Sequence, residues 1–133
     1  MFKHLFGSQQ KPAKTKFEFK LLHTFENRKL ESERLRNNEK WKNHIPVIIE
    51  KSDVVGTPDI SKKKMLVPED VTIAQFLHTL RRYVKMDHTQ AMFVFVDGSH
   101  IPQLSDTMGS IYAKHVDKDG FLYLSYTLEQ TFG

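Results

Sequence analysis

Histidines are the side chains in this sequence that are best suited to metal binding or to acid–base chemistry near neutral pH. There are seven of them, and no pair has the H-E-x-x-H spacing that places two imidazoles on one face of a helix. Isolated histidines of this kind are typical of a protein surface. We therefore predict no metal site and no cofactor from His4, His23, His44, His78, His88, His100 and His115.

Two further clusters contain groups that could bind calcium or attack a substrate. Residues 117–120 read Asp-Lys-Asp-Gly, as in the middle of a calcium loop, but the register puts His115 at the first ligand position and Tyr126 at the last, so an Asp-Gly turn explains them better. Residues 97–100 contain Asp, Ser and His without the G-x-S-x-G turn that presents a nucleophilic serine. No glycine-rich phosphate loop is present, and the sequence predicts a protein that is not an enzyme.

The absence of cysteine excludes thiol nucleophiles, thiolate metal sites and disulfide bonds, and it is compatible with a reducing compartment. A chain of 133 residues, of which 39% are hydrophobic, normally forms one domain with its own core. No apolar run approaches the roughly 18 residues of a membrane span, and the amino end lacks the longer apolar run of a secretory signal. We expect one soluble domain that is not exported by that route.

Positive charge is concentrated at the amino end of the chain. Residues 1–42 hold 11 Lys and Arg against 5 Asp and Glu, residues 43–133 hold 9 against 11, and the net charge of the whole chain is +4. Nucleic-acid binding requires basic residues interleaved with exposed aromatic ones, and most aromatic residues here fall in predicted core strands. The charge therefore indicates a docking surface at one end, and we expect no nucleic-acid partner.

Hydrophobic periodicity predicts the elements that position these side chains. Residues 1–16 form a basic arm that we expect to be mobile, and the domain begins near Phe17, followed by a charge-laced surface helix from Thr24 to about Lys40. The remaining elements are strands at 45–51 and 65–68, a main helix at 72–84 that begins with a capping box, a strand at 91–96, a short helix or turn at 105–115 and a strand at 121–126.

This order predicts an α+β domain in which one main helix packs across a small mixed sheet, which is the β-grasp plan preceded by additional helical material. Pro46 lies near the start of the first strand. Because proline has no N–H to donate, it is typical of an edge strand or of the start of a strand.

Several motifs, in one order and spacing, resemble the autophagy ubiquitin-like modifier family, which includes GABARAP and the microtubule-associated light chains. The resemblance runs from about Phe19 to Gly133 and implies a β-grasp (ubiquitin-like) fold with two additional amino-terminal helices, a domain over residues 17–128 and a flexible tail over 129–133. The motifs that carry it are KLESER at 29–34, HIPVIIEK at 44–51, KKKMLVP at 62–68, TIAQF at 72–76, FVFV at 93–96 and DKDGFLY at 117–123.

The resemblance implies that Gly133 is conjugated to phosphatidylethanolamine by an activating and a conjugating enzyme, and that the lipid-bound form acts in autophagosome formation and recruits cargo receptors. The expected location is the cytoplasm, and the autophagosomal membrane after conjugation. A cysteine protease is a further expected partner if residues follow Gly133 in the encoded protein. The tail is polar and ends in a residue without Cβ, which can thread a narrow enzyme channel.

The resemblance also implies a groove for peptides with an aromatic-x-x-aliphatic motif. If strand 45–51 is an edge next to strand 64–68, an extended peptide can pair with it through backbone hydrogen bonds. Lys62 and Lys64 would attract acidic residues that flank the motif. The implied aromatic pocket consists of Glu31, Leu35, Pro46, Ile48, Lys64, Leu66 and Phe121, and the aliphatic pocket consists of Met65, Val67, Pro68, Val71, Phe76 and Leu80.

Some positions depart from the family, and simpler interpretations stay open beside the functional ones. Residues 37–40 include two extra residues, His44 stands where the family usually has Arg or Lys, and Thr79 and Tyr83 replace apolar and basic residues. The arm has its own aromatic-x-x-aliphatic spacing at residues 2–5. Phe76 and Leu80 could be core, the lysines could be only solvated, and an unconjugated peptide-binding adaptor of ubiquitin-like fold is the alternative function.

Overall fold

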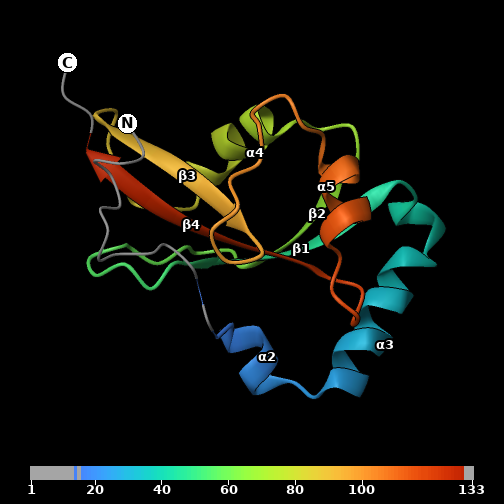
Figure 1. The fold of residues 1–133 in the computed structure, drawn as a ribbon. Coiled ribbons are helices and arrows are strands. Elements are labelled where there is room, and N and C mark those ends of the chain that lie inside the picture. The colour runs from blue at the N-terminus through green and yellow to red at the C-terminus, as the bar shows by residue number, and fades with distance from the viewer. Residues whose placement is uncertain (1–13, 15, 131–133) are drawn as a thin grey trace.

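The computed structural model describes residue 14 and residues 16–130 (Figure 1). Most of the predicted arm, including its aromatic-x-x-aliphatic segment, lies outside the described residues, as does Gly133, the residue expected to be conjugated. The elements are α2 (Glu18–Leu22), α3 (Phe25–Arg36), the 3-10 helix η1 (Glu39–Trp41), β1 (His44–Lys51), β2 (Lys64–Pro68), α4 (Ile73–Leu80), β3 (Gln90–Val96), α5 (Met108–His115) and β4 (Leu122–Gln130). This order confirms the predicted α+β succession, and the two amino-terminal helices α2 and α3 are present.

Four strands form one mixed sheet in the order β2-β1-β4-β3. β1 and β4 run parallel, and the two outer pairs are antiparallel. The possibility that β1 is an edge strand is therefore wrong, because it has a partner on each side. The open edge beside it belongs to β2.

Pro46 is tolerated inside the sheet because its nitrogen faces no acceptor. Ile49 N donates to Lys63 O (2.8 Å), and in an antiparallel ladder this makes the pair Pro46–Leu66 one that exchanges no hydrogen bonds. On the other side, the parallel ladder with β4 starts only at Val47. Pro46 thus occupies the start of a strand, which was the other predicted role for this residue.

The face of the sheet that α4 covers carries the main core (Figure 1). The capping box is confirmed, because the Thr72 side chain accepts from Gln75 N and the Gln75 side chain accepts from Thr72 N. α4 ends at Leu80, four residues before the predicted end, and Val84 instead forms an isolated bridge with Ile60. None of the helices in the described ranges is long and apolar enough to cross a membrane.

The opposite face is covered by α2 and α3 through a second apolar cluster of Ile48, Phe121 and Tyr123, on which Phe17, Phe19 and Leu35 pack. α3 begins at the predicted cap, where Thr24 Oγ1 accepts from Asn27 N (3.2 Å), and it ends at Arg36 rather than near residue 40. Asn38 then caps the separate helix η1, so the region with the extra residues starts a new turn and does not lengthen the helix.

The last strand, β4, is longer than predicted and pairs with β3 as far as Gln130. Residues 129 and 130, which were expected to belong to the tail, are thus strand residues. Gln130 pairs with Gln90, the first residue of β3.

Candidate functional site

The outer edge of β2 presents unpaired backbone groups to solvent. Lys64 and Leu66 lie in pairs that exchange no hydrogen bonds with β1, by the same alternation that accommodates Pro46. Their N–H and C=O groups therefore point away from β1, and β2 is the last strand on that side of the sheet. An extended peptide can add here as a further strand, with its side chains directed alternately to the two faces.

A small apolar pocket of about 170 Å³ opens beside this edge, between β2 and α4. It brings together five of the six residues implied for the aliphatic pocket. The sixth, Leu80, is fully buried in the main core and does not line the pocket. The lining residues are Lys62, Met65, Leu66, Val67, Pro68, Val71, Phe76, Thr79 and Tyr83.

The residues implied for the aromatic pocket lie close together, but other side chains cover the innermost of them. Ile48 and Phe121 are completely buried, and the ion pair between the Lys64 ammonium and the Glu31 carboxylate connects β2 to α3 above them. Leu35 packs on the same cluster. Phe17 and Phe19 pack on the cluster as well, so an aromatic side chain must displace some of these neighbours to reach it.

A cavity of about 430 Å³ on the flank of α3 includes only two of the seven implied residues, Glu31 and Leu35. It is lined entirely by α3, and Pro46, Ile48, Lys64, Leu66 and Phe121 do not contribute to it. This hollow is therefore not the implied aromatic pocket.

The three consecutive lysines before and in β2 have different electrostatic partners. Lys64 pairs with Glu31, whereas Lys63 lies 3.4 Å from Asp59 and 3.7 Å from Glu18. Burial alone would lower the pKa of Lys63, but these carboxylates raise it above its ordinary value. The Lys62 ammonium lies 5.7 Å from the centre of the Tyr83 ring, at the rim of the apolar pocket, and it is the cation best placed to meet an acidic peptide flank there.

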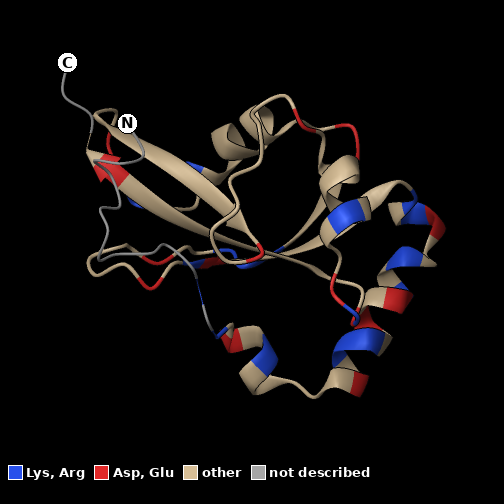
Figure 2. Ribbon diagram, viewed as in Figure 1, with Lys and Arg blue, Asp and Glu red and all other residues tan. Residues whose placement is uncertain are grey.

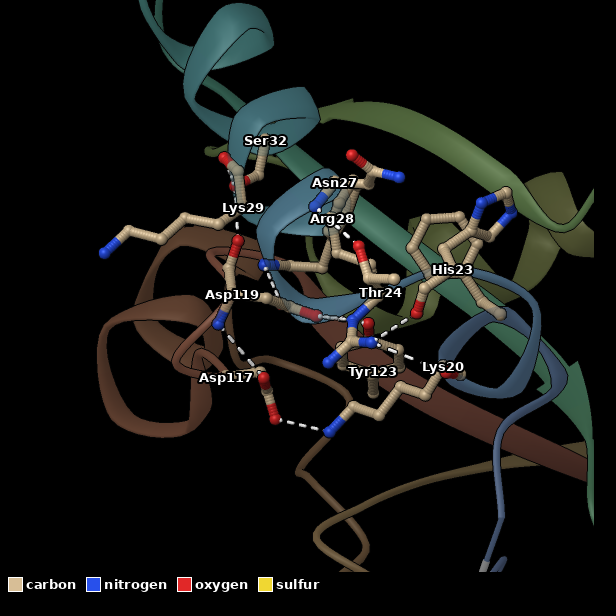
Figure 3. A network of polar contacts seen from close by, with 12 residues as sticks. Lys20, His23, Thr24, Asn27, Arg28, Lys29, Ser32, Asp117, Asp119 and Tyr123 are labelled. Carbon is tan, nitrogen blue, oxygen red and sulfur yellow. Dashed lines mark hydrogen bonds and ion pairs between the residues drawn. The ribbon is translucent and has the colours of Figure 1, made fainter.

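A buried polar network holds α3, and with it Glu31 and Leu35, against the sheet (Figure 3). Arg28 Nε donates to Asp119 Oδ2 (2.7 Å), Arg28 Nη1 donates to His23 O (2.7 Å) and the Tyr123 hydroxyl donates to the same Asp119 oxygen (2.5 Å). Asp119 is completely buried. Burial, reinforced by Asp119, raises the pKa of Tyr123 well above its usual range, so the phenol stays a donor.

The sequence reasoning missed this network, because Arg28 and Asp119 are 91 positions apart. The residue that could have indicated it is Asp119 itself, an acidic residue followed by Gly120 and an apolar strand. Its Oδ1 accepts from Phe121 N (2.9 Å) and the Ser32 hydroxyl donates to its backbone carbonyl. In this turn the Asp119 carboxylate therefore serves as a hydrogen-bond acceptor within the fold rather than as a calcium ligand.

The other clusters noted in the sequence do not assemble into catalytic or metal sites in the described part of the chain. Asp97 contacts the imidazole of His115 rather than that of His100. Within residue 14 and residues 16–130, no three His, Asp or Glu side chains are arranged to hold a metal ion. A cavity of about 1200 Å³ lies between α4, β3 and the loop 99–105, away from the edge of β2.

Comparison with known proteins decides the family. A sequence model of the family described as "Autophagy protein Atg8 ubiquitin like" matches residues 27–133. The chain belongs to the Atg8 family. "Autophagy-related protein 8" of Mycosarcoma maydis is 48% identical over 115 residues, which are 86% of this chain and 95% of that protein. "Autophagy-related protein 8A" of Oryza sativa subsp. indica is 46% identical over 86% of this chain and 94% of its own length.

Solved structures of Atg8 proteins share the fold. Trypanosoma brucei ATG8 superposes with a TM-score of 0.80 at 34% identity, over 90% of this chain and all of that one. Plasmodium falciparum Atg8, in complex with a Plasmodium falciparum Atg3 peptide, gives 0.74 at 28% identity over 88% of this chain and all of that chain. The ubiquitin-like fold, the resemblance found in the sequence and the absence of an enzymatic role are thereby confirmed.

Proposed function

We propose that this Atg8-family protein is a modifier joined through Gly133 to phosphatidylethanolamine. The observation that carries the proposal is the family match, which extends to residue 133 and so includes the glycine. Because the chain has no cysteine, its enzymes supply the thiols. The Gly133 carboxylate first attacks a nucleoside triphosphate to form an acyl nucleotide, with pyrophosphate as the leaving group. An enzyme thiol then displaces the nucleoside monophosphate to give a thioester, and the lipid amine attacks the thioester carbonyl. The amide forms and the thiol leaves.

The proposed enzyme partners are an activating and a conjugating enzyme, with a deconjugating cysteine protease if residues follow Gly133. The conjugating enzyme is supported by Plasmodium falciparum Atg8, which was solved with an Atg3 peptide. The proposed location is the cytoplasm, and the autophagosomal membrane after conjugation.

The second part of the proposal is a receptor-binding groove at β2. The peptide backbone pairs with Lys64 and Leu66, the aliphatic residue enters the pocket of about 170 Å³ between β2 and α4, and the aromatic residue displaces Glu31 from Lys64 to reach Ile48 and Phe121. An acidic residue beside the aromatic one can replace Glu31 as the partner of Lys64. The groove therefore favours motifs with acidic flanks.

Conjugation is tested by reconstituting activation and transfer on phosphatidylethanolamine vesicles and measuring the mass of the product. The Gly133→Ala variant should give no lipid-linked product and should still bind aromatic-x-x-aliphatic peptides, because it leaves the pocket and the edge of β2 unchanged. Continued lipid attachment of this variant would refute conjugation through Gly133.

An unconjugated peptide-binding adaptor is the second candidate, and one observation favours it. The groove is built entirely from described residues of the folded domain, so it does not depend on lipid attachment. Wild-type protein that binds motif peptides but yields no lipid-linked product with active enzymes of its own pathway would support the adaptor.

A further inference from the structure

Among the apolar side chains that line the pocket beside β2, that of Met65 has the most rotatable bonds. This residue belongs to the main core cluster and lines the pocket, and only 7% of its surface is exposed. It pairs with Val47 in the sheet, so its backbone is fixed. The freedom that remains lies in its unbranched side chain, which has three rotatable bonds and a polarizable sulfur.

The other apolar walls are stiff by comparison. Val67, Val71 and Thr79 are branched at Cβ, which restricts them to few rotamers, and the Thr79 hydroxyl donates to Gln75 O (3.2 Å) within α4. Pro68 is cyclic, and Phe76 is 1% exposed and packed in the core. Leu66 and Lys62 lie at the open side, on the edge of β2 and beyond its start.

A rigid apolar pocket distinguishes ligands strongly by size. One methylene more or less changes affinity by about 10- to 200-fold when the walls cannot move. A wall that changes rotamer at low cost removes most of this discrimination, since the side chain withdraws for a large ligand and advances for a small one. Surfaces that bind many partners use methionine for this reason.

We propose that Met65 is the specificity-determining residue of this pocket, and that it lets the pocket accept second anchors from valine to methionine and phenylalanine. This inference rests on the proposed peptide groove. The partners are therefore acidic-flanked peptides with a fixed aromatic anchor and a variable second anchor, and not only those with a branched aliphatic residue there.

The test uses short synthetic peptides with two glutamates, a tryptophan and, three residues after it, Val, Ile, Leu, Met or Phe. Their dissociation constants are measured by calorimetry with the wild-type protein and with Met65→Ile, whose side chain is close in volume but stiff, and suited to a strand. We expect the constants to span less than about tenfold for the wild type and well over tenfold for Met65→Ile, by the rigid-pocket value above.

Met92→Ile is the matched control. Met92 also lies on a strand, is 6% exposed and belongs to the same core cluster, but it does not line this pocket. Its substitution should leave the affinity profile flat. Methyl-labelled methionine adds a direct readout, because the Met65 methyl signal should take a different position with each peptide while the Met92 signal does not follow the anchor.

Three outcomes separate the claims. A flat wild-type profile that becomes steep only in Met65→Ile, with anchor-dependent Met65 methyl shifts, supports the inference. A steep wild-type profile, or a profile that Met65→Ile leaves unchanged, overturns it while leaving the groove intact. Failure of every peptide to bind the wild type, or failure of a tryptophan-to-alanine peptide to lose affinity, overturns the groove itself and the inference with it.

Discussion

Replacing Asp119 by alanine should destabilise the protein strongly, because it breaks a buried ion pair from one side. The carboxylate is completely buried and receives three donors, Arg28 Nε, the Tyr123 hydroxyl and Phe121 N. Burial alone would lower the pKa of Arg28, but Asp119 raises it above its ordinary value, so the guanidinium stays charged. Alanine leaves that charge nearly buried without its partner.

Breaking a buried pair from one side costs about 3–5 kcal/mol, which is a large part of the 5–15 kcal/mol typical of a domain. Part of this cost is compensated, because Arg28 Nη1 also donates to the carbonyls of His23 and Lys20 (2.7 and 3.4 Å). We therefore expect about 3 kcal/mol for Asp119→Ala. The double variant Arg28→Met/Asp119→Asn should lose less unfolding free energy than the sum of the losses in Arg28→Met and Asp119→Asn, because neither charge is then buried without its partner.

Urea unfolding followed by circular dichroism measures these free energies. Lys63→Met is the control, because the Lys63–Asp59 pair is exposed, with 40% and 57% of the two side chains accessible, and exposed pairs contribute about 0–1 kcal/mol. A loss below about 1 kcal/mol for Asp119→Ala, or equal losses for the two variants, would show that the network does not hold α3 on the sheet as we argue.

The other predictions concern a glycine, a titrating pair and the open strand edge. Gly120→Ala should lower the free energy of unfolding by about 1–3 kcal/mol, since φ is +91° and a Cβ would lie 2.3 Å from Ser32 Oγ; a urea midpoint unchanged from wild type would contradict this. Burial would raise the pKa of Asp117, but Lys20 holds it below its ordinary value, so the pair stabilises the fold above about pH 4 and this contribution disappears as the pH falls through the lowered pKa. The difference in urea midpoint between wild type and Lys20→Met should therefore shrink on acidification, and a growing difference would reverse the sign of the argument. Leu66→Pro removes an outward N–H and should weaken motif-peptide binding by up to about tenfold through that bond, whereas Leu66→Ala retains the N–H; equal affinities of the two variants would count against strand addition.

Much of the local structure could be predicted because it depends on neighbouring residues. The capping box at Thr72, the cap at Thr24 and the turn at residues 117–120 each follow from side chains that accept from backbone N–H groups two or three residues later. The helix ends were less predictable. α4 ends at Leu80 although the apolar spacing continues to Val84, because Val84 forms an isolated antiparallel bridge with Ile60.

The distribution of charge was also predictable from the sequence, whereas the pairing of the charges was not (Figure 2). The sequence shows lysine and arginine concentrated in residues 1–42, and Figure 2 shows acidic residues alternating with them along α3. Which charges are available to a ligand depends on pairing across the fold. Lys63 and Lys64 are held by carboxylates from α2, α3 and the loop before β2, whereas Lys62 packs on Tyr83.

By itself, the sequence determined the succession of elements, the absence of thiol chemistry and the family motifs, because periodicity, residue type and order are properties of the chain. Only the tertiary structure decided that β2 and not β1 is the open edge, that Leu80 is buried in the core rather than in the pocket wall, and that Glu31 of α3 pairs with Lys64 of β2. Strand order and burial depend on contacts between residues far apart in sequence, such as Val47 with Leu122. Local propensity carries no information about which of several compatible partners a strand will take.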